Sequence, residues 1–259
     1  MVSRPEQGAF VGKTALVTGG ASGIGRACIQ ELVRGGAQVV IADINDALGK
    51  AMANEIGEDA MYCRLDVSSN EAWTRAIEAA TSWFGGLNIL VNCAGMAIAG
   101  SIETATLEDW QRTLDVNATG TFLGCQNAVR TMRNHGGAIV NIASARAHRV
   151  SRNQLAYSCS KAMVVRMTEG IALHCAEEKL PIRCNAVCPG VIDTPILGDT
   201  VQRFGGGTAG VEALVRLNPI GRLGTAEEIA NAVCFLASER ASFITGAALD
   251  VDGAFRIRD

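Results

Sequence analysis

One of the two tyrosines in this 259-residue chain stands four residues before a lysine, in the segment Tyr157-Ser-Cys-Ser-Lys161. In a helix, residues i and i+4 share a face, so the ammonium group of Lys161 would lie beside the phenol of Tyr157. A phenol titrates at about pH 10 and is a poor base at neutral pH, but a nearby cation lowers its pKa. The pair therefore predicts proton transfer with a substrate. The alternative is a core aromatic beside a solvated lysine.

A serine precedes this pair at a position that suits catalysis. Ser144 lies 13 residues before Tyr157 and directly follows the apolar run 138–143, which predicts a buried strand. Ligands of open parallel sheets bind at the carboxyl ends of the strands. We therefore expect the Ser144 hydroxyl to lie at the same edge of the sheet as the phenol.

A glycine-rich turn, Thr18-Gly-Gly-Ala-Ser-Gly-Ile-Gly25, connects the first apolar run to a helical pattern. Its glycines permit a sharp turn and leave room for a pyrophosphate at the helix N-terminus, where free N–H groups favour negative charge. Such a turn alone is a weak signal, because ordinary helix entries also use glycine. The predicted contacts here are Gly19, Ser22, Gly23, Ile24 and Gly25.

Acidic residues end the next two apolar runs. Asp43 follows Gly25 by 18 residues, and a carboxylate there would accept both ribose hydroxyls and repel a 2′-phosphate. This favours NAD over NADP, with Ile44 as a neighbouring contact. Asp66 and Val67 end the third run and are predicted to border the adenine. The alternatives are a solvated surface carboxylate for Asp43 and a helix cap for Asp66.

Short apolar runs alternate with longer segments of helical period. Ile24, Cys28 and Leu32 recur every four residues, and both Ser68–Glu71 and Thr225–Glu228 have the pattern of a helix capping box. The predicted strands are Thr14–Thr18, Val39–Ala42, Ala60–Val67, Ile89–Asn92, Ala138–Ala143, Ile182–Val187 and Ala247–Val251. This alternation predicts an α/β fold: one doubly wound, Rossmann-type domain over residues 1–259, with a seven-stranded parallel sheet and helices on both faces.

One segment, about residues 191–217, does not follow this alternation. Its glycine run Gly205–Gly207 interrupts a weak helical pattern, so we expect an irregular loop. Long loops inside compact domains are typical of active-site lids, and a lid is the prediction for this segment.

Composition excludes several classes of function. With 26 acidic and 23 basic residues the formal charge is −3, and no basic patch for nucleic acid or membrane surfaces is apparent. The N-terminal stretch MVSRPEQGAF lacks the apolar core of a signal peptide, and no apolar run is long enough for a membrane span. Nine scattered cysteines without a CxxC pair, and only three histidines, predict neither disulfides nor a metal site. We expect a cytoplasmic protein.

The motifs occur together in an order that resembles the short-chain dehydrogenase/reductase family, and the resemblance extends from Gly12 to Gly253. The motifs that carry it are Thr18–Gly25, Asn92-Cys-Ala-Gly95, Asn117, Ser144, Tyr157 with Lys161, and Pro189-Gly190. The resemblance implies hydride transfer between a nicotinamide cofactor and a substrate carbon.

The resemblance also implies a role for each site residue. Tyr157 is expected to act as general acid/base, and Ser144 to hydrogen-bond the substrate oxygen. Lys161 is expected to lower the pKa of Tyr157 and to hold the nicotinamide ribose, and Asn117 to position a water in a proton relay. Further cofactor contacts implied by the motifs are Asn92, Ala94, Gly95, Pro189, Gly190, Ile192 and Thr194.

One residue departs from the family pattern. Cys93 stands where the family usually has a second asparagine, so the bracing of the sheet is expected to differ there. A nucleophilic role for Cys93 lacks a base, because none of the three histidines falls in a matching motif.

The substrate is the least constrained prediction. Segments beginning at Asp43, Leu65 and Phe122 are similar to bacterial 3β/17β-hydroxysteroid dehydrogenases, and the apolar residues of segment 191–217 suit a hydrophobic secondary alcohol, steroid-like, alicyclic or aromatic. The arginines within Arg146–Arg152 either bind an anionic substrate group or lie in solvent or subunit contacts.

Two other functions are weighed against this dehydrogenase. A 3-oxoacyl thioester reductase is disfavoured by Asp43, and a non-catalytic NAD-binding module by the intact Ser144, Tyr157 and Lys161. Members of the family commonly form tetramers, so the resemblance also implies a homotetramer.

Overall fold

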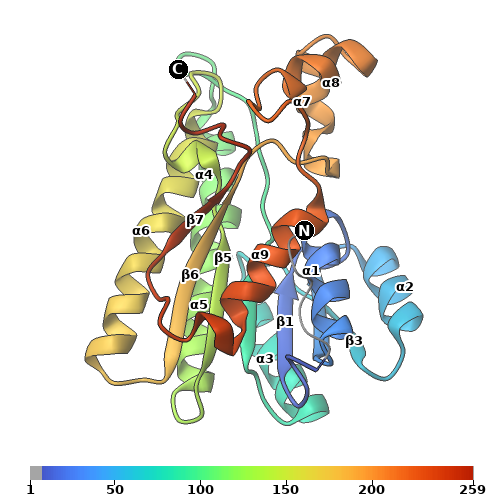
Figure 1. The fold of residues 1–259 in the computed structure, drawn as a ribbon, viewed down its shortest axis with the longest axis vertical. Coiled ribbons are helices and arrows are strands. Elements are labelled where there is room, and N and C mark those ends of the chain that lie inside the picture. The colour runs from blue at the N-terminus through green and yellow to red at the C-terminus, as the bar shows by residue number, and fades with distance from the viewer. Residues whose placement is uncertain (1–7, 259) are drawn as a thin grey trace.

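Seven short apolar segments form one parallel sheet in the computed structural model, which describes residues 8–258 (Figure 1). The strands are β1 Thr14–Thr18, β2 Gln38–Asp43, β3 Ala60–Arg64, β4 Ile89–Asn92, β5 Gly137–Ile142, β6 Ile182–Pro189 and β7 Ala248–Val251. Their spatial order is β3-β2-β1-β4-β5-β6-β7, and every neighbouring pair is parallel. The predicted single α/β domain with a seven-stranded parallel sheet is confirmed.

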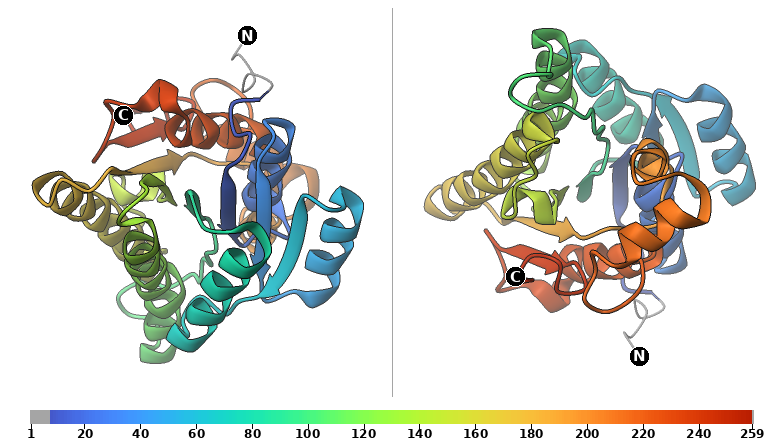
Figure 2. Two further views of the ribbon diagram at one scale, coloured as in Figure 1. Left: turned by 90° about the horizontal axis from the view of Figure 1, so that it is seen from below. Right: turned by 90° about the horizontal axis from the view of Figure 1, so that it is seen from above.

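Helices cover both faces of this sheet (Figure 2). They are α1 Gly23–Arg34, α2 Asp46–Ile56, α3 Asn70–Phe84, α4 Leu107–Leu114, α5 Gly120–Met132, α6 Leu155–Glu177, α7 Gly198–Arg203, α8 Gly207–Val215 and α9 Ala226–Ala237. Successive strand residues point to opposite faces, so Val17 packs in one core with α1 and α9 while Leu16 packs in the other with α3 and α5. This explains why the five inner strands are mostly apolar: each is buried on both faces. The edge strands β3 and β7 are only partly buried.

Polar residues fix where several helices begin. The hydroxyl of Thr225 accepts a hydrogen bond from Glu228 N, and the Glu228 carboxylate accepts one from Thr225 N at 2.9 Å, which confirms the predicted capping box at α9. At α3 the cap is Ser69 and not Ser68, because Ser69 Oγ accepts from Ala72 N at 3.2 Å.

The third strand is shorter than predicted. It ends at Arg64, three residues before the predicted end at Val67, because the carboxylate of Asp66 turns the chain. Asp66 Oδ1 accepts hydrogen bonds from Ser68 N at 3.0 Å and from Ser68 Oγ at 2.7 Å. The other strand boundaries agree with the prediction to within two residues.

Segment 191–217 is largely helical, which corrects the expectation of an irregular loop. A 3₁₀ turn at Pro195–Leu197 leads into α7, and α8 starts at Gly207. Only residues 204–206 separate α7 from α8, and Gly205 and Gly206 have φ of 109° and 70°. Gly210 has no side chain to keep the two helices apart: a Cβ there would lie 3.0 Å from Val201 Cγ1. The two helices therefore pack as one hairpin.

In the part of the chain that the structure describes, no helix combines the length and the apolarity needed to traverse a lipid bilayer. Residues 1–7, which include most of the stretch used to argue against a signal peptide, lie outside the described residues, as does Asp259 at the predicted end of the domain.

Candidate active site

The carboxyl ends of the strands face α7 and α8 (Figure 1). Three adjacent hollows lie at these ends. Two of them, of about 550 and 1000 Å³, share Ser22, Asp43 and Ile44 and extend along the ends of β1 to β4. The third, of about 510 Å³, extends from the glycine-rich turn to Ser144, Tyr157 and the helical hairpin. We call the first two the groove and the third the inner cavity.

Glycines shape the turn between β1 and α1. Gly19 and Gly23 have φ of 63° and 51°, a region that side chains disfavour. A Cβ on Gly19 would lie 2.9 Å from Ala94 Cα, and one on Gly25 would lie 2.8 Å from the carbonyl carbon of Gly19. Since α1 begins at Gly23, its free N–H groups face this cradle. The arrangement fits the phosphates of a dinucleotide.

Asp43 is fixed at the end of β2 by backbone hydrogen bonds. Its Oδ2 accepts from Ala21 N at 3.0 Å and its Oδ1 accepts from Asn45 N at 2.9 Å. Each carboxylate oxygen keeps a further lone pair, and the residue lines the groove beside the exposed side chain of Ile44. The carboxylate is therefore positioned to accept hydroxyl groups from a ligand in the groove.

The far wall of the groove contains most of the other predicted contacts. Asp66, Val67, Ala94 and Gly95 line it. Ala94 is held in place by a residue that we did not predict to be part of the site: the Thr18 hydroxyl accepts hydrogen bonds from both Cys93 N and Ala94 N at 3.0 Å. The backbone at Cys93 and Ala94 is thus braced against the end of β1.

The side chain of Asn92 lines neither the groove nor the inner cavity, and its predicted contact with a cofactor stays a prediction. Its side chain is buried, and Nδ2 donates to Asn141 Oδ1 at 2.9 Å. Asn141 Nδ2 in turn donates to Thr168 Oγ1 at 2.9 Å on α6. Asn92 therefore connects β4 to β5 beneath the site.

Tyr157 and Lys161 lie on one face of α6, as their spacing predicts. Lys161 Nζ is 5.8 Å from the centre of the Tyr157 ring and donates to the carbonyl of Ile142 at 2.8 Å. The absence of a side chain at Gly95 permits this approach, because a Cβ there would lie 3.4 Å from Nζ. Burial lowers the pKa of Lys161 to about 8.

The pKa of Tyr157 reflects its burial and two polar neighbours. Burial raises the pKa of the phenol, and the interactions that oppose this are those with the Ser144 hydroxyl and the Arg146 guanidinium. The Lys161 ammonium donates to the Ile142 carbonyl. Its expected lowering of the pKa of Tyr157 stays a prediction.

Ser144 stands at the end of β5 and lines the inner cavity with Tyr157. It is 6% exposed, and its Oγ accepts from Arg146 N at 3.1 Å, which fixes the side chain at the start of the 3₁₀ turn Ala145–Ala147. A substrate oxygen in this cavity can thus meet both the Ser144 hydroxyl and the Tyr157 phenol.

Asn117 lies in a π-helical turn, Asp115–Thr119, between α4 and α5. Its amide is fully buried: Oδ1 accepts from Met96 N, and Nδ2 donates to Met96 O, both at 2.9 Å. Nδ2 also lies 3.0 Å from Ser160 Oγ, which donates to Tyr157 O at 2.8 Å. The side chain braces the helix that carries Tyr157, and its expected role in positioning a water stays a prediction.

The remaining predicted contacts follow β6. Pro189, Gly190, Ile192 and Thr194 all line the inner cavity, opposite the glycine-rich turn. Gly190 passes close to the backbone of Asp252, where a Cβ would lie 2.7 Å from the carbonyl oxygen. The absence of a side chain at Gly190 thus permits this contact between β6 and the C-terminal segment.

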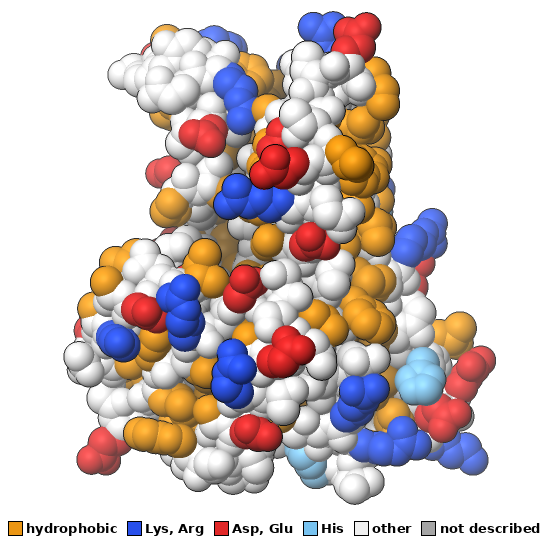
Figure 3. All heavy atoms as spheres, turned by 180° about the vertical axis from the view of Figure 1, so that it is seen from behind, with side chains coloured by type: hydrophobic (Ala, Val, Ile, Leu, Met, Phe, Trp, Pro, Cys, Tyr) orange, Lys and Arg blue, Asp and Glu red, His pale blue; other side chains and the backbone are white. Residues whose placement is uncertain are grey.

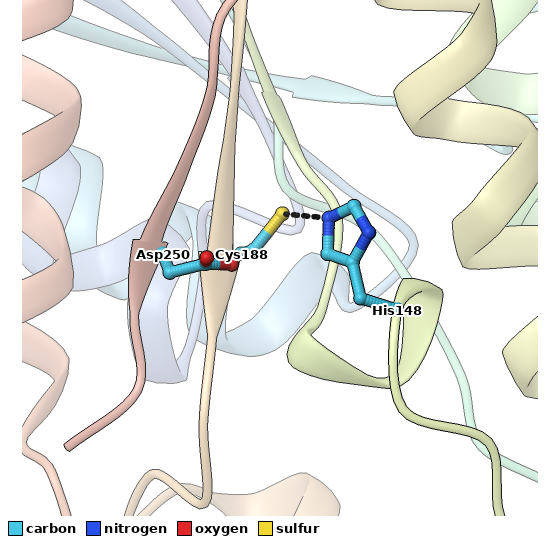
Figure 4. A group of neighbouring side chains, drawn as sticks. All are labelled: His148, Cys188 and Asp250. Carbon is cyan, nitrogen blue, oxygen red and sulfur yellow. Dashed lines mark hydrogen bonds between the residues drawn. The ribbon is translucent and has the colours of Figure 1, made fainter. Parts of the chain in front are cut away.

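Three side chains of metal-ligand type, His148, Cys188 and Asp250, lie close together (Figure 4). Cys188 and Asp250 are register partners on β6 and β7, and Cys188 Sγ lies 3.9 Å from His148 Nε2. Asp250 is balanced by Arg256, whose Nε lies 2.7 Å from Oδ2, and burial raises the pKa of Cys188 to about 12. Cys188 is therefore a protonated thiol at neutral pH, and we assign the group to packing at the sheet edge.

Comparisons with known proteins agree with this geometry. A family model described as "Enoyl-(Acyl carrier protein) reductase" matches residues 19–255. The 3-beta-hydroxysteroid dehydrogenase of Comamonas testosteroni is 40% identical over 243 residues, covering 94% of this chain and 95% of that protein. The trans-4-hydroxycyclohexanecarboxylate dehydrogenase of Sinomonas cyclohexanicum is 38% identical over 250 residues, covering 93% and 92%.

A third relative, the 2,5-dichloro-2,5-cyclohexadiene-1,4-diol dehydrogenase of Sphingobium indicum, is 36% identical over 252 residues, covering 96% of this chain and 98% of that protein. These matches span the groove and the inner cavity together. The chain is therefore an oxidoreductase of secondary alcohols and ketones that uses a nicotinamide cofactor. It belongs to the short-chain dehydrogenase/reductase family.

Proposed function

We propose that the protein is an NAD(H)-dependent dehydrogenase that interconverts a hydrophobic ring alcohol and its ketone. The observation that supports this most is the convergence of Ser144, Tyr157 and Lys161 on one cavity that also reaches the glycine-rich turn. A substrate oxygen at the two hydroxyl groups would place its carbon in the same cavity as the reacting end of a dinucleotide.

Each residue of this group has a distinct proposed role. Tyr157 gives a proton to the substrate oxygen during ketone reduction, and the raised pKa of its phenol keeps that proton in place at neutral pH. Ser144 donates a hydrogen bond to the same oxygen and stabilises its developing negative charge. When bound, the cofactor supplies or accepts the hydride, and its oxidised ring carries a positive charge.

Alcohol oxidation reverses the proton transfer. Tyr157 then has to lose its proton, which the Ser144 hydroxyl and the positive charge of Arg146 favour because both lower the pKa of the phenol. Lys161, with a pKa of about 8, is proposed to hold the nicotinamide ribose and to pass protons toward solvent with Asn117. These roles of Lys161 and Asn117 rest on the family resemblance.

We assign NAD over NADP because of Asp43. Its carboxylate lines the groove and is anchored by two backbone N–H groups, so it cannot easily turn away from a ligand. A 2′-phosphate at this position would face a negative charge, whereas ribose hydroxyls would find two acceptors. The proposed dinucleotide contacts are Gly19, Ser22, Gly23, Ile24, Gly25, Asp43, Ile44, Asp66, Val67, Ala94 and Gly95.

The substrate side is proposed to be closed by segment 191–217, which acts as a lid. Ile196, Leu197, Phe204 and Leu214 from this segment line the inner cavity and supply an apolar cover. Relatives named for a hydroxysteroid, a hydroxycyclohexanecarboxylate and a cyclohexadiene diol all act on ring alcohols, which supports this substrate class. No residue of the cavity favours a thioester over a ring alcohol.

We also propose a homotetramer, supported by apolar residues on exposed helices. Phe122 on α5 and Met163 and Leu173 on α6 are 46%, 45% and 59% exposed, and hydrophobic side chains gather along the side of the molecule where α6 lies (Figure 3). Exposed apolar area of this kind is typical of subunit contacts. Sedimentation analysis tests the assembly, with Phe122→Lys expected to yield smaller species.

A cytoplasmic location is supported by the thiols. All nine cysteines are free, and six of them are buried. Unpaired cysteines in this number are typical of proteins that work in a reducing compartment.

The decisive test of the proposed activity is a substrate panel. Steroid, alicyclic and aryl secondary alcohols are offered with NAD and then with NADP, and NADH formation is followed by absorbance. Oxidation of at least one ring alcohol with NAD supports the proposal, whereas turnover of 3-oxoacyl thioesters alone would contradict it.

A further inference from the structure

The inner cavity is positively charged and contains no compensating acid. Arg146, Lys161 and Arg203 line it, whereas no Asp or Glu does. Lys161 is already engaged by the Ile142 carbonyl and lies beside Tyr157. Two arginines therefore remain for a ligand, one beside Ser144 and one on α7.

Arg146 is the better placed of the two. It is partly buried, and its guanidinium makes no hydrogen bond or ion pair with any side chain or carbonyl of residues 8–258. Its Cζ stacks 4.8 Å from the centre of the Phe255 ring. A partly desolvated guanidinium with unused N–H donors is costly unless an anion pairs with it.

A second arginine increases this positive potential. Arg149 Cζ lies 5.2 Å from the same Phe255 ring. Burial lowers the pKa of Arg146, and the charge of Arg149 lowers it further. Unlike Arg146, Arg149 uses its guanidinium within the protein, because its Nη1 donates a hydrogen bond to the Phe255 carbonyl at 2.7 Å. Arg149 therefore supports the site, and Arg146 is left to face the cavity.

The platform beneath Arg146 is rigid. Phe255 is 3% exposed, and the chain on each side of it is anchored by the Asp252 carboxylate, which accepts from Ala254 N at 3.0 Å and from Arg256 N at 2.8 Å. Arg146 follows Ser144 by only two residues, and its backbone N–H donates to Ser144 Oγ. The guanidinium is thus held in advance at a fixed position relative to the proposed reaction centre.

We propose that Arg146 binds a carboxylate group of the substrate, so that the substrate is a ring alcohol with an acidic substituent. This inference rests on the proposed function and specifies its substrate. A planar guanidinium matches a carboxylate with two parallel hydrogen bonds, which a single arginine can provide. The apolar residues of segment 191–217 then cover the ring, and Ser144 and Tyr157 meet the hydroxyl at the far end.

Binding tests this site without relying on turnover. Cyclohexanecarboxylate and cyclohexanecarboxamide are titrated by calorimetry into the protein saturated with NADH. The carboxylate is expected to bind at least about tenfold more tightly, and Arg146→Met to abolish that difference. Arg152→Met is the matched control, because Arg152 is exposed and does not line the cavity. Equal affinity for the two compounds, or an unchanged preference in Arg146→Met, would overturn the inference.

Two further controls exclude a folding defect. Arg146→Met must keep the NADH affinity of the wild type and a melting temperature no lower than that of the wild type. Arg146→Lys keeps the positive charge but loses the planar guanidinium, and it is expected to recover part of the preference for the carboxylate. If Arg146→Met does not fold, the result for Arg146→Lys decides. An Arg146→Lys protein that prefers the carboxylate over the carboxamide as strongly as the wild type would contradict recognition by two parallel hydrogen bonds.

Turnover separates this inference from the proposed function. We expect 4-hydroxycyclohexanecarboxylate to be oxidised with a kcat/KM at least about tenfold above that of its methyl ester. If acid and ester are oxidised equally, the dehydrogenase assignment stands and the carboxylate site fails. If neither is oxidised while the carboxylate still binds through Arg146, the ring-alcohol assignment fails and the anion site stands.

Discussion

Lys161 Nζ lies 5.8 Å from the centre of the Tyr157 ring and donates its hydrogen bond to the carbonyl of Ile142, at the end of β5. The ammonium therefore hydrogen-bonds to the sheet and lies beside the ring of the proposed proton donor. Lys161 is 4% exposed, and no carboxylate lies beside it in the inner cavity. Its positive charge is therefore buried without an opposite charge, which is unfavourable. This relationship accounts for the lowered pKa of Lys161 and has a measurable effect on stability.

Lys161→Met should change how stability depends on pH. The pKa of Lys161 is lowered from its ordinary value of 10.5 to about 8 in the folded protein, so the unfolded chain binds more protons between these values. The burial penalty is therefore fully present below pH 8 and is relieved as the pH rises toward 10.5. Relative to Lys161→Met, the wild type should gain about 2 to 3 kcal/mol between roughly pH 7 and pH 10.

Denaturant unfolding of both proteins without cofactor measures this difference. The other titrating groups are common to the two proteins, so their contributions to the free energy of unfolding cancel in the comparison. A stability difference that stays constant over this range would show that the Lys161 ammonium is not held against burial.

Asp43→Asn should change the choice of cofactor. The amide keeps the shape of the side chain and one oxygen acceptor but removes the negative charge that would face a 2′-phosphate. The ratio of kcat/KM for NAD to that for NADP is expected to fall at least about tenfold, equivalent to about 1.4 kcal/mol. A wild type that already prefers NADP would contradict the assignment of Asp43 to the ribose.

Gly25→Ala should disrupt the glycine-rich turn. The added Cβ would lie 2.8 Å from the carbonyl carbon of Gly19, and this contact involves backbone that has no room to move. We expect at least a tenfold loss of NADH affinity together with a lower melting temperature. Gly86→Ala is the matched control, because a Cβ at Gly86 has no neighbour within 4 Å. Similar effects of the two substitutions would indicate that Gly25 is not special.

The features that follow from local pattern were predictable. Apolar runs between helical patterns identified the sheet because strands buried on both faces need no polar alternation. The spacing of Tyr157 and Lys161 placed both on one face of α6, and glycine at positions 19, 23 and 25 indicated the tight turn. The geometry at Asp43 also follows from its place at the end of an apolar run.

Contacts between distant parts of the chain were not predictable in this way. Asn92 belongs to a site motif but bonds to Asn141, 49 residues away, inside the sheet. Phe255 meets Arg149 across 106 residues, and only this contact reveals that Arg146 has a platform. The helices of segment 191–217 were missed because glycine disfavours helices, whereas here Gly210 permits α7 and α8 to pack closely.

Tyr157→Phe tests the central claim most directly. The substitution removes one hydroxyl and leaves the ring, so the fold and the groove should be preserved. We expect alcohol oxidation and ketone reduction with an accepted substrate to fall by at least about 10²–10⁴-fold, the usual contribution of a general acid/base. NADH affinity, measured by fluorescence, should remain that of the wild type. A Tyr157→Phe protein with normal turnover would contradict the proposed mechanism.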